Sequence, residues 1–415
     1  MKQPIMKQPV SLAAHCGATF ALSQLIMCAA WADDSAAIAD LKAKLEVTQR
    51  DVNQLVESDS KGPADTGAPL HGFADVGFTR ASNNDTRLDQ AGRGFSAGSL
   101  GLYFTPQFGD RAKALVELIF EFAPDGGLAT DLERIQLGYT FNDQLTAWMG
   151  RFHAPYGYWN TAFHHGMQIQ ASVLRPRFND FEDKGGLLPV HVMGAWATGH
   201  VGMGDGKLAY DLYTGNGNAI DVTTAIDKHD GTLAINNSRD SNGNTLIGAN
   251  IGYNIGGLVV GVHGFSERVN IRDVATTTAL GEVSVKMTGL YGFYEDDNWE
   301  TIAEYYRFNN ENLTGGAGSH SSWLAFAQVA RTFGNDWTPY VRVEKASLNQ
   351  NDLYFSSQQF GVSYTRQALG VRYNLNAKAA LKFEANQTKE GDGTPATGPQ
   401  NGSYGEGQVQ YAIRF

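Results

Sequence analysis

One polar segment of the chain, residues 154–186, holds most of the side chains that could do chemistry. Together with those at its ends, its histidines and clustered acids are His153, His164, His165, Glu182, Asp183 and His191. Imidazole and carboxylate groups bind transition metals, so a metal site is one interpretation. However, adjacent His164 and His165 point opposite ways in an extended chain, and the segment has no His-x-x-x-His or cysteine pair. Solvated or loop-packing histidines are the preferred interpretation, and we predict no metal and no other cofactor.

The same segment contains Arg175-Pro176-Arg177, which could bind a phosphate or carboxylate through paired N–H groups. A loop arginine is more often tied to a neighbouring acid such as Glu182. Catalysis has less support, because Ser172 near His164 and His165 is the only grouping that suggests a nucleophile, and no Gly-x-Ser-x-Gly motif occurs. We therefore predict that the chain is not an enzyme.

Segments of alternating polarity flank this loop and must position it. The final one has Val409, Tyr411, Ile413 and Phe415 on one face, and Gln408, Gln410, Ala412 and Arg414 on the other. Successive side chains of a strand point to opposite faces, so such a segment can present one face to lipid and the other to water. This is the sequence pattern of a membrane β-barrel.

The alternation predicts about sixteen strands. Their ranges are 71–80, 97–106, 111–122, 130–141, 145–153, 187–199, 206–215, 245–255, 257–268, 282–295, 299–309, 321–333, 338–347, 366–376, 378–389 and 405–415. Short turns and longer polar connections alternate between them without a break. An up-and-down antiparallel barrel with both ends in the periplasm requires this parity.

Charged residues on the strands indicate which face is inside. A charge that faces lipid at mid-bilayer costs about 2–4 kcal/mol, so the charged face must line a polar interior. The candidate wall residues are Lys113, Glu117, Glu121, Arg134, Arg342, Glu344, Arg372, Lys382, Glu384 and Arg414. Both signs occur, so neither a cation nor an anion preference follows.

Aromatic residues gather near the predicted strand ends, where rings at the headgroup level of a membrane would account for them. The two groups are Trp148, Phe152, Tyr156, Tyr158 and Trp159, and Tyr291, Phe293, Tyr294 and Trp299.

The chain has 415 residues, 42% hydrophobic and 18% charged, which is typical of a globular protein.

Residues 1–32 fit a secretory signal peptide, with Lys2 and Lys7 before an apolar stretch and Ala30-Trp31-Ala32 as a cleavage site. Its removal takes away two lysines and no acids, so the formal charge changes from −11 to −13. That balance does not support nucleic-acid binding. No later apolar run is long enough for a membrane-spanning helix.

A seven-residue repeat follows the signal. Its a and d positions are Ile38, Leu41, Leu45, Thr48, Val52 and Leu55. We interpret residues 33–57 as a short periplasmic coiled-coil helix, with a lone amphipathic helix as the alternative. Residues 58–70, rich in Ser, Gly and Pro, are a linker, and residues 71–415 are the transmembrane β-barrel domain.

The signal, the coiled coil, about sixteen strands, the long third loop and the terminal Tyr411-x-x-x-Phe415 together resemble the general porin superfamily of Gram-negative bacteria. The resemblance covers roughly residues 71–415. It implies that the loop 154–186 folds into the barrel and narrows the pore. The constriction candidates carried over in this way are Arg175, Arg177, Glu182, Asp183 and Lys184. The chain lacks the Pro-Glu-Phe-Gly-Gly loop motif of the enterobacterial general porins, so no substrate is carried over.

The expected function is a water-filled porin for passive diffusion of small hydrophilic solutes or ions across the bacterial outer membrane. The implied partners are outer-membrane lipid, two further copies in a homotrimer, and the barrel-assembly machinery that reads Tyr411 and Phe415. Two alternatives stay open. One is a specific phosphate or carboxylate channel, and the other is an envelope tether, or a sheath for a periplasmic partner. Residues 33–57 could contact peptidoglycan or such a partner.

Overall fold

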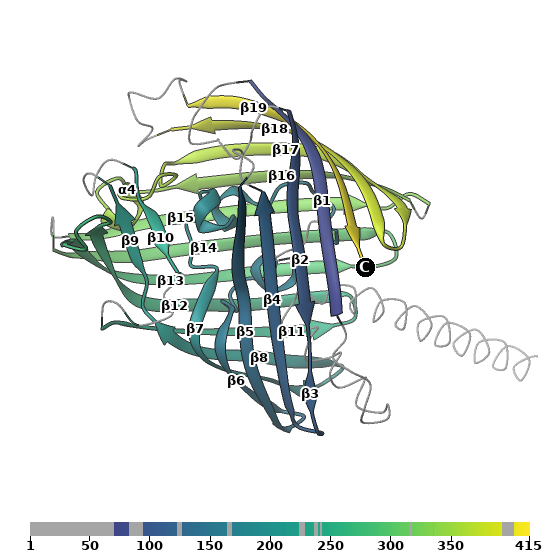
Figure 1. Cartoon of the computed structure of the whole chain (residues 1–415), viewed down its shortest axis with the longest axis horizontal. Helices are drawn as coiled ribbons and strands as arrows, with labels where there is room; N and C mark the ends of the chain where they lie inside the picture. The colour runs from purple at the N-terminus through teal and green to yellow at the C-terminus, as the bar shows by residue number, and fades with distance from the viewer. Residues whose placement is uncertain are drawn as a thin grey trace, which may run out of the picture.

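The computed structural model of this protein is a closed antiparallel β-barrel (Figure 1). It describes residues 70–82, 94–122, 127–163, 168–223, 229–235, 240, 243–314, 318–334, 336–391 and 402–415, except for the side chain of Asp183. The predicted signal 1–32, the coiled coil 33–57 and residues 58–69 of the predicted linker 58–70 lie outside these ranges, so those predictions remain untested, and Leu70 is the first residue of β1. Within the described residues, no helix has the length and apolar character needed to cross a membrane.

Sixteen strands form the wall, which confirms the predicted fold class. They are β1 (Leu70–Ala81), β2 (Gly94–Phe104) with its short continuation β3 (Gln107–Phe108), β4 (Ala112–Phe122), β5 (Leu128–Asn142), β6 (Leu145–His153), β7 (His191–Met203), β8 (Gly206–Asn216), β11 (Thr245–Ile255), β12 (Leu258–Asp273), β13 (Ala279–Glu295), β14 (Trp299–Thr314), β15 (Gly318–Arg331), β16 (Trp337–Ser347), β17 (Tyr364–Asn376), β18 (Ala379–Glu390) and β19 (Ser403–Arg414). Each predicted strand overlaps one of them.

The two ends of the chain close the barrel. β1 pairs with β2 on one edge and with β19 on the other, both antiparallel. Beyond the last strand, the Phe415 amide donates to the Gly72 carbonyl over 2.9 Å, and the Gly72 amide donates to the Phe415 carbonyl over 3.0 Å. Closure leaves no unpaired edge, which a membrane-spanning sheet requires because lipid offers no hydrogen-bonding partner.

Several long connections contain structure that the alternation did not predict. Between β8 and β11, β9 (Ala219–Val222) and β10 (Thr232–Ala234) form a small hairpin. β9 pairs in parallel with the loop end of β12, and Gly231 forms a bridge with Gln358 beside α4 (Leu353–Ser356). Two long loops therefore contact each other at one end of the barrel, where β9, β10 and α4 lie together (Figure 1).

The inner face is not uniformly polar, which corrects the interpretation of the strand alternation. Strands β12–β15 point apolar side chains inward: Phe265, Val283, Val285, Met287, Tyr291, Phe293, Ile302, Tyr306, Phe308, Leu324 and Phe326 are all buried. The assignment of clustered aromatics to the headgroup level was wrong for most of them. Trp148, Phe152, Tyr156, Trp159, Tyr291 and Phe293 are buried, whereas Tyr294 and Trp299 are exposed on the outer face. The two-residue alternation of side chains along a strand does not by itself show whether an apolar face meets lipid or is covered by protein inside the barrel.

Candidate functional site

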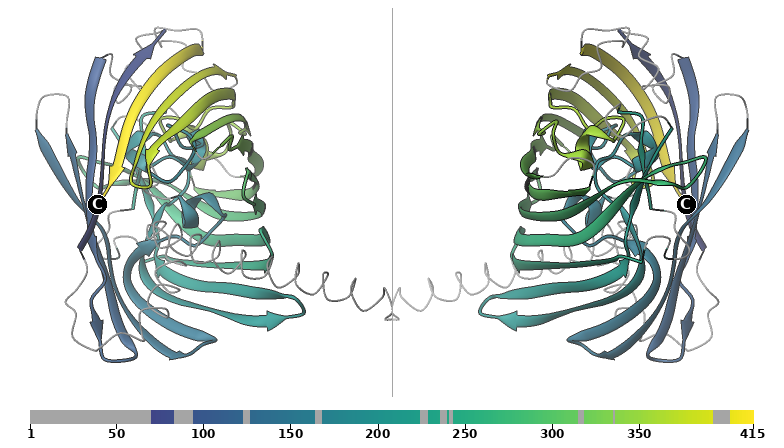
Figure 2. Two further views of the ribbon diagram at one scale, coloured as in Figure 1. Left: turned by 90° about the vertical axis from the view of Figure 1, so that its right-hand side faces the viewer. Right: turned by 90° about the vertical axis from the view of Figure 1, so that its left-hand side faces the viewer.

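The connection between β6 and β7 folds into the barrel and packs against the apolar part of its inner face. It contains α3 (Trp159–Ala162) and two 3-10 turns, η3 (Arg177–Asn179) and η4 (Glu182–Lys184). Figure 2 shows these teal segments inside the ring of strands. Trp159 and Phe178 are fully buried, and both rings contact Phe326 of β15. The aromatic inner faces of β14 and β15 are thus the surface on which this loop rests.

Three wall carboxylates accept hydrogen bonds from backbone amides of the loop. Glu304 Oε1 on β14 accepts from Tyr158 N and Trp159 N over 2.7 and 2.6 Å. Glu384 Oε2 on β18 accepts from Val173 N and Leu174 N over 2.9 and 3.0 Å. Glu344 Oε2 on β16 accepts from Arg177 N over 2.8 Å. Because ionised acceptors make the stronger hydrogen bonds, these contacts hold the loop by its main chain at three strands.

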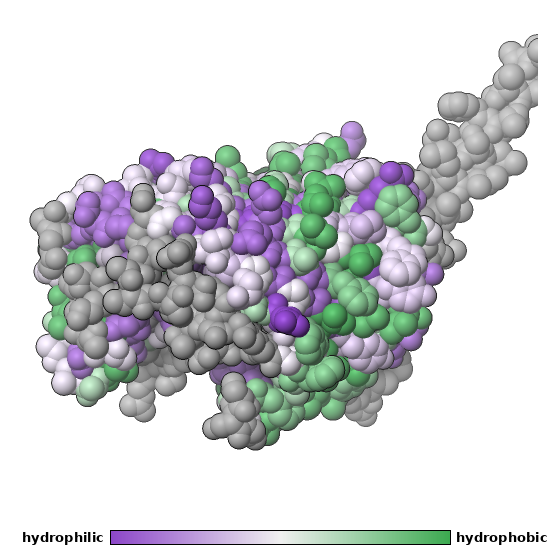
Figure 3. Space-filling model, turned by 90° about the horizontal axis from the view of Figure 1, so that it is seen from above, coloured by the Kyte–Doolittle hydropathy of each residue, from purple (hydrophilic) through white to green (hydrophobic). Residues whose placement is uncertain are grey.

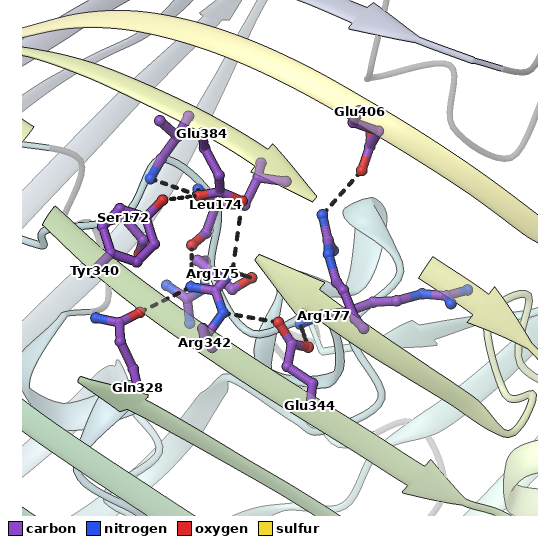
Figure 4. A network of polar contacts seen from close by, with 12 residues as sticks. Ser172, Leu174, Arg175, Arg177, Gln328, Tyr340, Arg342, Glu344, Glu384 and Glu406 are labelled. Atoms are coloured by element: carbon purple, nitrogen blue, oxygen red, sulfur yellow. Dashed lines mark hydrogen bonds and ion pairs between the residues drawn. The ribbon is translucent and has the colours of Figure 1, made fainter. Parts of the chain in front are cut away.

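Wall cations hold the carbonyl groups of the same stretch (Figure 4). Arg342 Nη1 on β16 donates to the Leu174 carbonyl over 2.8 Å, and its Nη2 donates to the Arg175 carbonyl over 3.2 Å. Arg372 on β17 donates to the Ile169 carbonyl over 2.8 Å, and Lys382 on β18 donates to the Ser172 carbonyl over 3.0 Å. Buried polar groups must be hydrogen-bonded, and here the charged wall satisfies those of an otherwise irregular loop.

The two loop arginines are buried and engaged in contacts within the protein. Arg175 Nε donates to the Asn179 carbonyl over 2.8 Å, and its guanidinium lies 4.5 Å from the Phe181 ring centroid. Arg177 forms an ion pair with Glu390 of β18 and lies 4.7 Å from the Tyr364 ring centroid. Burial lowers the pKa of Arg175, an effect that the nearby Asp180 carboxylate opposes.

On the opposite wall, ion pairs connect β4 and β5 to each other and to the loop. Arg134 Nε and Glu117 Oε2 are 2.6 Å apart and fully buried. Lys184 Nζ of the loop lies 2.6 Å from Glu121 Oε1 on β4. The loop is therefore fastened to β14, β16, β17 and β18 on one side of the lumen and to β4 on the other.

A cavity of about 510 Å³ lies next to the loop, between β4, β5, β7 and the β9–β10 hairpin. Its lining side chains include five carboxylates, one histidine and one arginine. They are Glu121, Asp131, Glu133, Glu182, Asp221, His191 and Arg272. Arg272 is paired with Asp221, and Arg151 beside the cavity lies 3.5 Å from Asp131 Oδ2. Carboxylates outnumber cations in this part of the lumen.

The structure brings most of the predicted site residues into the barrel. Of the constriction candidates, Arg175, Arg177, Glu182 and Lys184 lie in the folded loop, and the side chain of Asp183 is outside the described part. Of the wall candidates, Lys113, Glu117, Glu121, Arg134, Arg342, Glu344, Arg372, Lys382 and Glu384 face inward. Arg414 lies at the turn end, where it donates to the Ala377 carbonyl over 3.0 Å. Whether any of them contacts a permeating solute stays a prediction.

The structure describes the surroundings of two of the histidines considered as metal ligands, His153 and His191. His191 Nε2 lies 2.5 Å from Glu133 Oε2, and His153 Nε2 lies 3.8 Å from Glu117 Oε2. His164 and His165 lie outside the described residues. Among the residues that the structure describes, no three His, Cys, Asp or Glu side chains are placed to hold a metal ion.

Sequence reasoning missed Glu304, although a signal was present. Glu304 is an inward acid between the apolar Ile302 and the aromatic Tyr306, on a strand whose inner face is otherwise apolar or aromatic at this level. A lone buried acid in such a run must find a hydrogen-bond partner. Its partner is the start of α3, which lies about 145 residues earlier in the chain.

No protein-family model matches the chain, and no curated protein matches its sequence. Solved structures do match. An anion-selective porin from Comamonas acidovorans superposes with a TM-score of 0.55 at 14% identity, covering 85% of this chain and 100% of that one. OmpT, an outer membrane protein of Vibrio cholerae in a trimer form, gives 0.54 at 12% identity over 85% and 100%. The outer membrane channel DcaP of Acinetobacter baumannii gives 0.51 at 12% identity over 85% and 99%.

These likenesses establish the fold as that of outer-membrane porins, which confirms the resemblance expected from the sequence at the level of architecture. The matched proteins are bacterial outer-membrane proteins, in agreement with the predicted location. At such low identities the likeness concerns the fold, and function must be argued from the residues of this chain.

Proposed function

We propose that this protein is an outer-membrane porin that forms a water-filled channel for passive diffusion of small hydrophilic solutes or ions. One observation carries the proposal. The third long loop lies inside a closed barrel and is held by charged side chains of both opposing walls. A barrel of sixteen strands is wide enough for an aqueous channel, and a fixed inner loop is a means of setting its width.

The loop 154–186 is the proposed constriction. The measurement is single-channel conductance of the purified protein in planar bilayers. Stepwise conductance is expected, and it should increase when a short Gly-Ser linker replaces residues 160–184. A bilayer that shows no conductance at high protein load would refute the channel proposal. A normal channel whose conductance does not change with the shortened loop would reject only the constriction.

The charge balance beside the loop favours cations over anions. Five carboxylates line the cavity of about 510 Å³. The arginines that could have gripped an anion, Arg175 and Arg177, are buried against Phe181 and Glu390. We therefore propose a cation-preferring channel. Reversal potentials in a salt gradient test this, and Glu121→Gln with Asp131→Asn should reduce the preference if these carboxylates set it.

An anion-specific channel remains the second candidate, because one of the matched porins is anion-selective. On that reading, Arg175→Ala with Arg177→Ala should abolish an anion preference. A reversal potential of the sign expected for cations in the wild-type protein would eliminate this candidate.

We propose no catalytic activity and a trimeric assembly. Ser172, the one suggested nucleophile, is fully buried, and its carbonyl is bound by Lys382. Esterase and protease assays with and without His165→Ala test the first statement. The trimer form of the Vibrio protein supports the second, and a monomeric mass after gentle detergent extraction would count against it. The assembly signal at Tyr411 and Phe415, and contacts of residues 33–57 with peptidoglycan or a periplasmic partner, also remain proposals.

A further inference from the structure

The cavity beside the inner loop, residues 154–186, has one charged wall and one apolar wall. Glu121 and Asp131, on β4 and β5, belong to the charged wall. The apolar wall includes Phe181 of the inner loop and Leu233 of β10, and both side chains are buried. At about 510 Å³ the cavity is within the range of small-molecule sites, roughly 300–1,000 Å³. It is therefore large enough for an organic solute with one polar and one apolar end.

A lysine of the protein itself shows what the charged wall can bind. Lys184 Nζ lies 2.6 Å from Glu121 Oε1 and 5.4 Å from the Phe181 ring centroid. An alkylammonium group is thus held between a carboxylate and an aromatic ring at the edge of the cavity, and both groups attract a cation. The side chains of Lys184 and Glu121 are 25% and 36% exposed, and ion pairs that are so accessible to water are weak. A free amine can therefore take the place of Lys184 on Glu121.

The register of β4 and β5 places a second carboxylate near the first. Asp131 is in register with Ile119, which lies two positions before Glu121 on the same face of β4. Diagonal neighbours of this kind are about 7–8 Å apart on adjacent strands. The side chain of Asp131 is 43% exposed, and its Oδ2 lies 3.5 Å from Arg151 Nη2, a long distance for a hydrogen bond. Both carboxylates can therefore accept from one ammonium group, which has three N–H donors.

The hairpin of β9 and β10, which supplies part of the apolar wall, is fixed to the rest of the barrel. Arg272 of β12 donates from Nε to Asp221 Oδ1 over 2.5 Å and from Nη2 to Asp221 Oδ2 over 3.3 Å. Glu267 Oε2, also on β12, accepts from Asn218 N and Asn218 Nδ2 over 3.0 and 2.9 Å. The other end of the hairpin is held by the bridge from Gly231 to the segment beside α4. Because these contacts are present without a ligand, binding would cost little ordering of this wall.

The cavity lies toward the loop end of the barrel. Glu121 is one position from the end of β4, and Asp131 is three positions from the start of β5. On the face seen in Figure 3, hydrophilic residues gather toward this end and hydrophobic ones toward the turn end. The loop end is thus the one that meets water, and a dissolved solute can approach the cavity from that side.

Other classes of solute match the two walls less well. An inorganic cation would make no use of the apolar wall, and within the described part of the chain no three His, Cys, Asp or Glu side chains are placed to hold a metal ion. An anion would face five lining carboxylates. A neutral apolar molecule would gain nothing from those carboxylates. A molecule with an ammonium group and an apolar part uses both walls.

We propose that this cavity binds a small organic cation, namely a protonated amine that carries an apolar chain or ring. The ammonium group lies between Glu121 and Asp131, and the apolar part contacts Phe181 and Leu233. The inference deepens the proposed cation preference by naming a substrate class. It rests on the proposed channel in so far as such amines reach the cavity on their way through the barrel.

Isothermal titration calorimetry of the full chain in detergent micelles measures this binding directly. The probe is 2-phenylethylamine, and the matched ligands are 2-phenylethanol, which lacks the charge, and ammonium chloride, which lacks the apolar part. The acid variant, Glu121→Gln with Asp131→Asn, removes the charges of one wall, and Leu233→Asn makes the other wall polar. The control, Glu311→Gln with Asp205→Asn, removes two exposed acids outside the cavity.

The amine should bind at least about ten-fold more tightly than either matched ligand. Its affinity should fall about ten-fold in the acid variant, because each partly exposed ion pair accounts for a factor of about three. It should fall about five-fold in Leu233→Asn, which loses apolar contact area, whereas the control keeps wild-type affinity. Equal binding of the amine and either matched ligand, or equal losses in the acid variant and the control, would overturn the proposal.

Heat-dependent gel mobility reports folding of each variant. If Leu233→Asn does not fold, the wild-type protein tests the apolar wall, since affinity should increase from methylamine through propylamine to 2-phenylethylamine. Equal affinities along that series would reject the site. Conductance is recorded with the same preparation. Binding without conductance would refute the channel and leave the site, whereas conductance without binding would refute only the site.

Discussion

Glu384 gives the sharpest test of how the inner loop is held. Its Oε2 accepts from Val173 N, Leu174 N and the Tyr340 hydroxyl, the last over 2.6 Å. Glu384→Ala removes the acceptor of two backbone amides, for which the described residues provide no other hydrogen-bond partner. Glu384→Gln keeps an acceptor oxygen and removes the charge, so it separates hydrogen bonding from electrostatics.

The free energy lost in Glu384→Ala can be estimated from the two backbone amides that lose their acceptor. Leaving a buried donor without an acceptor costs about 1–3 kcal/mol, so two amides cost about 2–6 kcal/mol. Lumen water can reach an undocked loop and replace part of the loss, so the lower end, about 2 kcal/mol, is the expected value. Since about 1.4 kcal/mol is a factor of ten, the undocked population of this part of the loop should increase about 30-fold.

Single-channel recording in planar bilayers measures that population as time spent in states of altered conductance. We expect such states to be rare in the wild type, about 30-fold more frequent in Glu384→Ala and intermediate in Glu384→Gln. Glu406→Ala is the matched control, because Glu406 is a buried acid of the neighbouring strand β19 that pairs with Arg366 over 3.0 Å and not with the loop backbone. Identical traces for Glu384→Ala and wild type, or equal effects of both alanine variants, would refute the reasoning.

Three further predictions concern stability and assembly. Arg134→Ala leaves the buried Glu117 carboxylate without its partner at 2.6 Å, so the barrel should lose about 3–5 kcal/mol in refolding titrations, and a loss below 1 kcal/mol would contradict this. Burial raises the pKa of Asp352, the N-cap of α4, to about 6. A raised carboxyl pKa stabilises the folded loop below about pH 4 and loses that contribution as the pH rises through 6, so the hydrogen-exchange protection factors at α4, corrected for the intrinsic exchange rate at each pH, should be larger at pH 4.5 than at pH 7.5, with little difference in Asp352→Asn. Deletion of Phe415 removes the backbone pair with Gly72 and the proposed assembly signal, so the amount of folded barrel in outer-membrane fractions should fall, whereas Phe415→Tyr should keep it.

The fold was predictable because its information is local. Lys113, Glu117 and Glu121 alternate with apolar residues within one strand, and the cost of a charge in lipid decides which of the two faces is inside. Likewise, the alternation of short turns with long connections follows from the chain itself. The same reasoning failed for Tyr291 and Phe293, because an apolar residue is compatible both with lipid and with a covered interior.

The contacts of the inner loop could not be predicted from local sequence patterns. Arg342, Arg372, Lys382 and Glu384 were correctly expected to face inward, but their contacts with the loop backbone join residues more than 160 positions apart. A charged side chain on a wall has the same sequence signature whether it faces solute or binds a main-chain amide. The partner is set by where the loop packs, and that depends on the aromatic faces of β14 and β15.

The sequence by itself determined the number of strands, their alternation and the side of the wall on which charges lie, since each follows from a period of two and from the cost of charge in lipid. Only the tertiary structure decided that the loop 154–186 rests on one half of the lumen and which charged side chains hold it. Those facts depend on register and closure, because strands far apart in the chain become neighbours only when the barrel is complete.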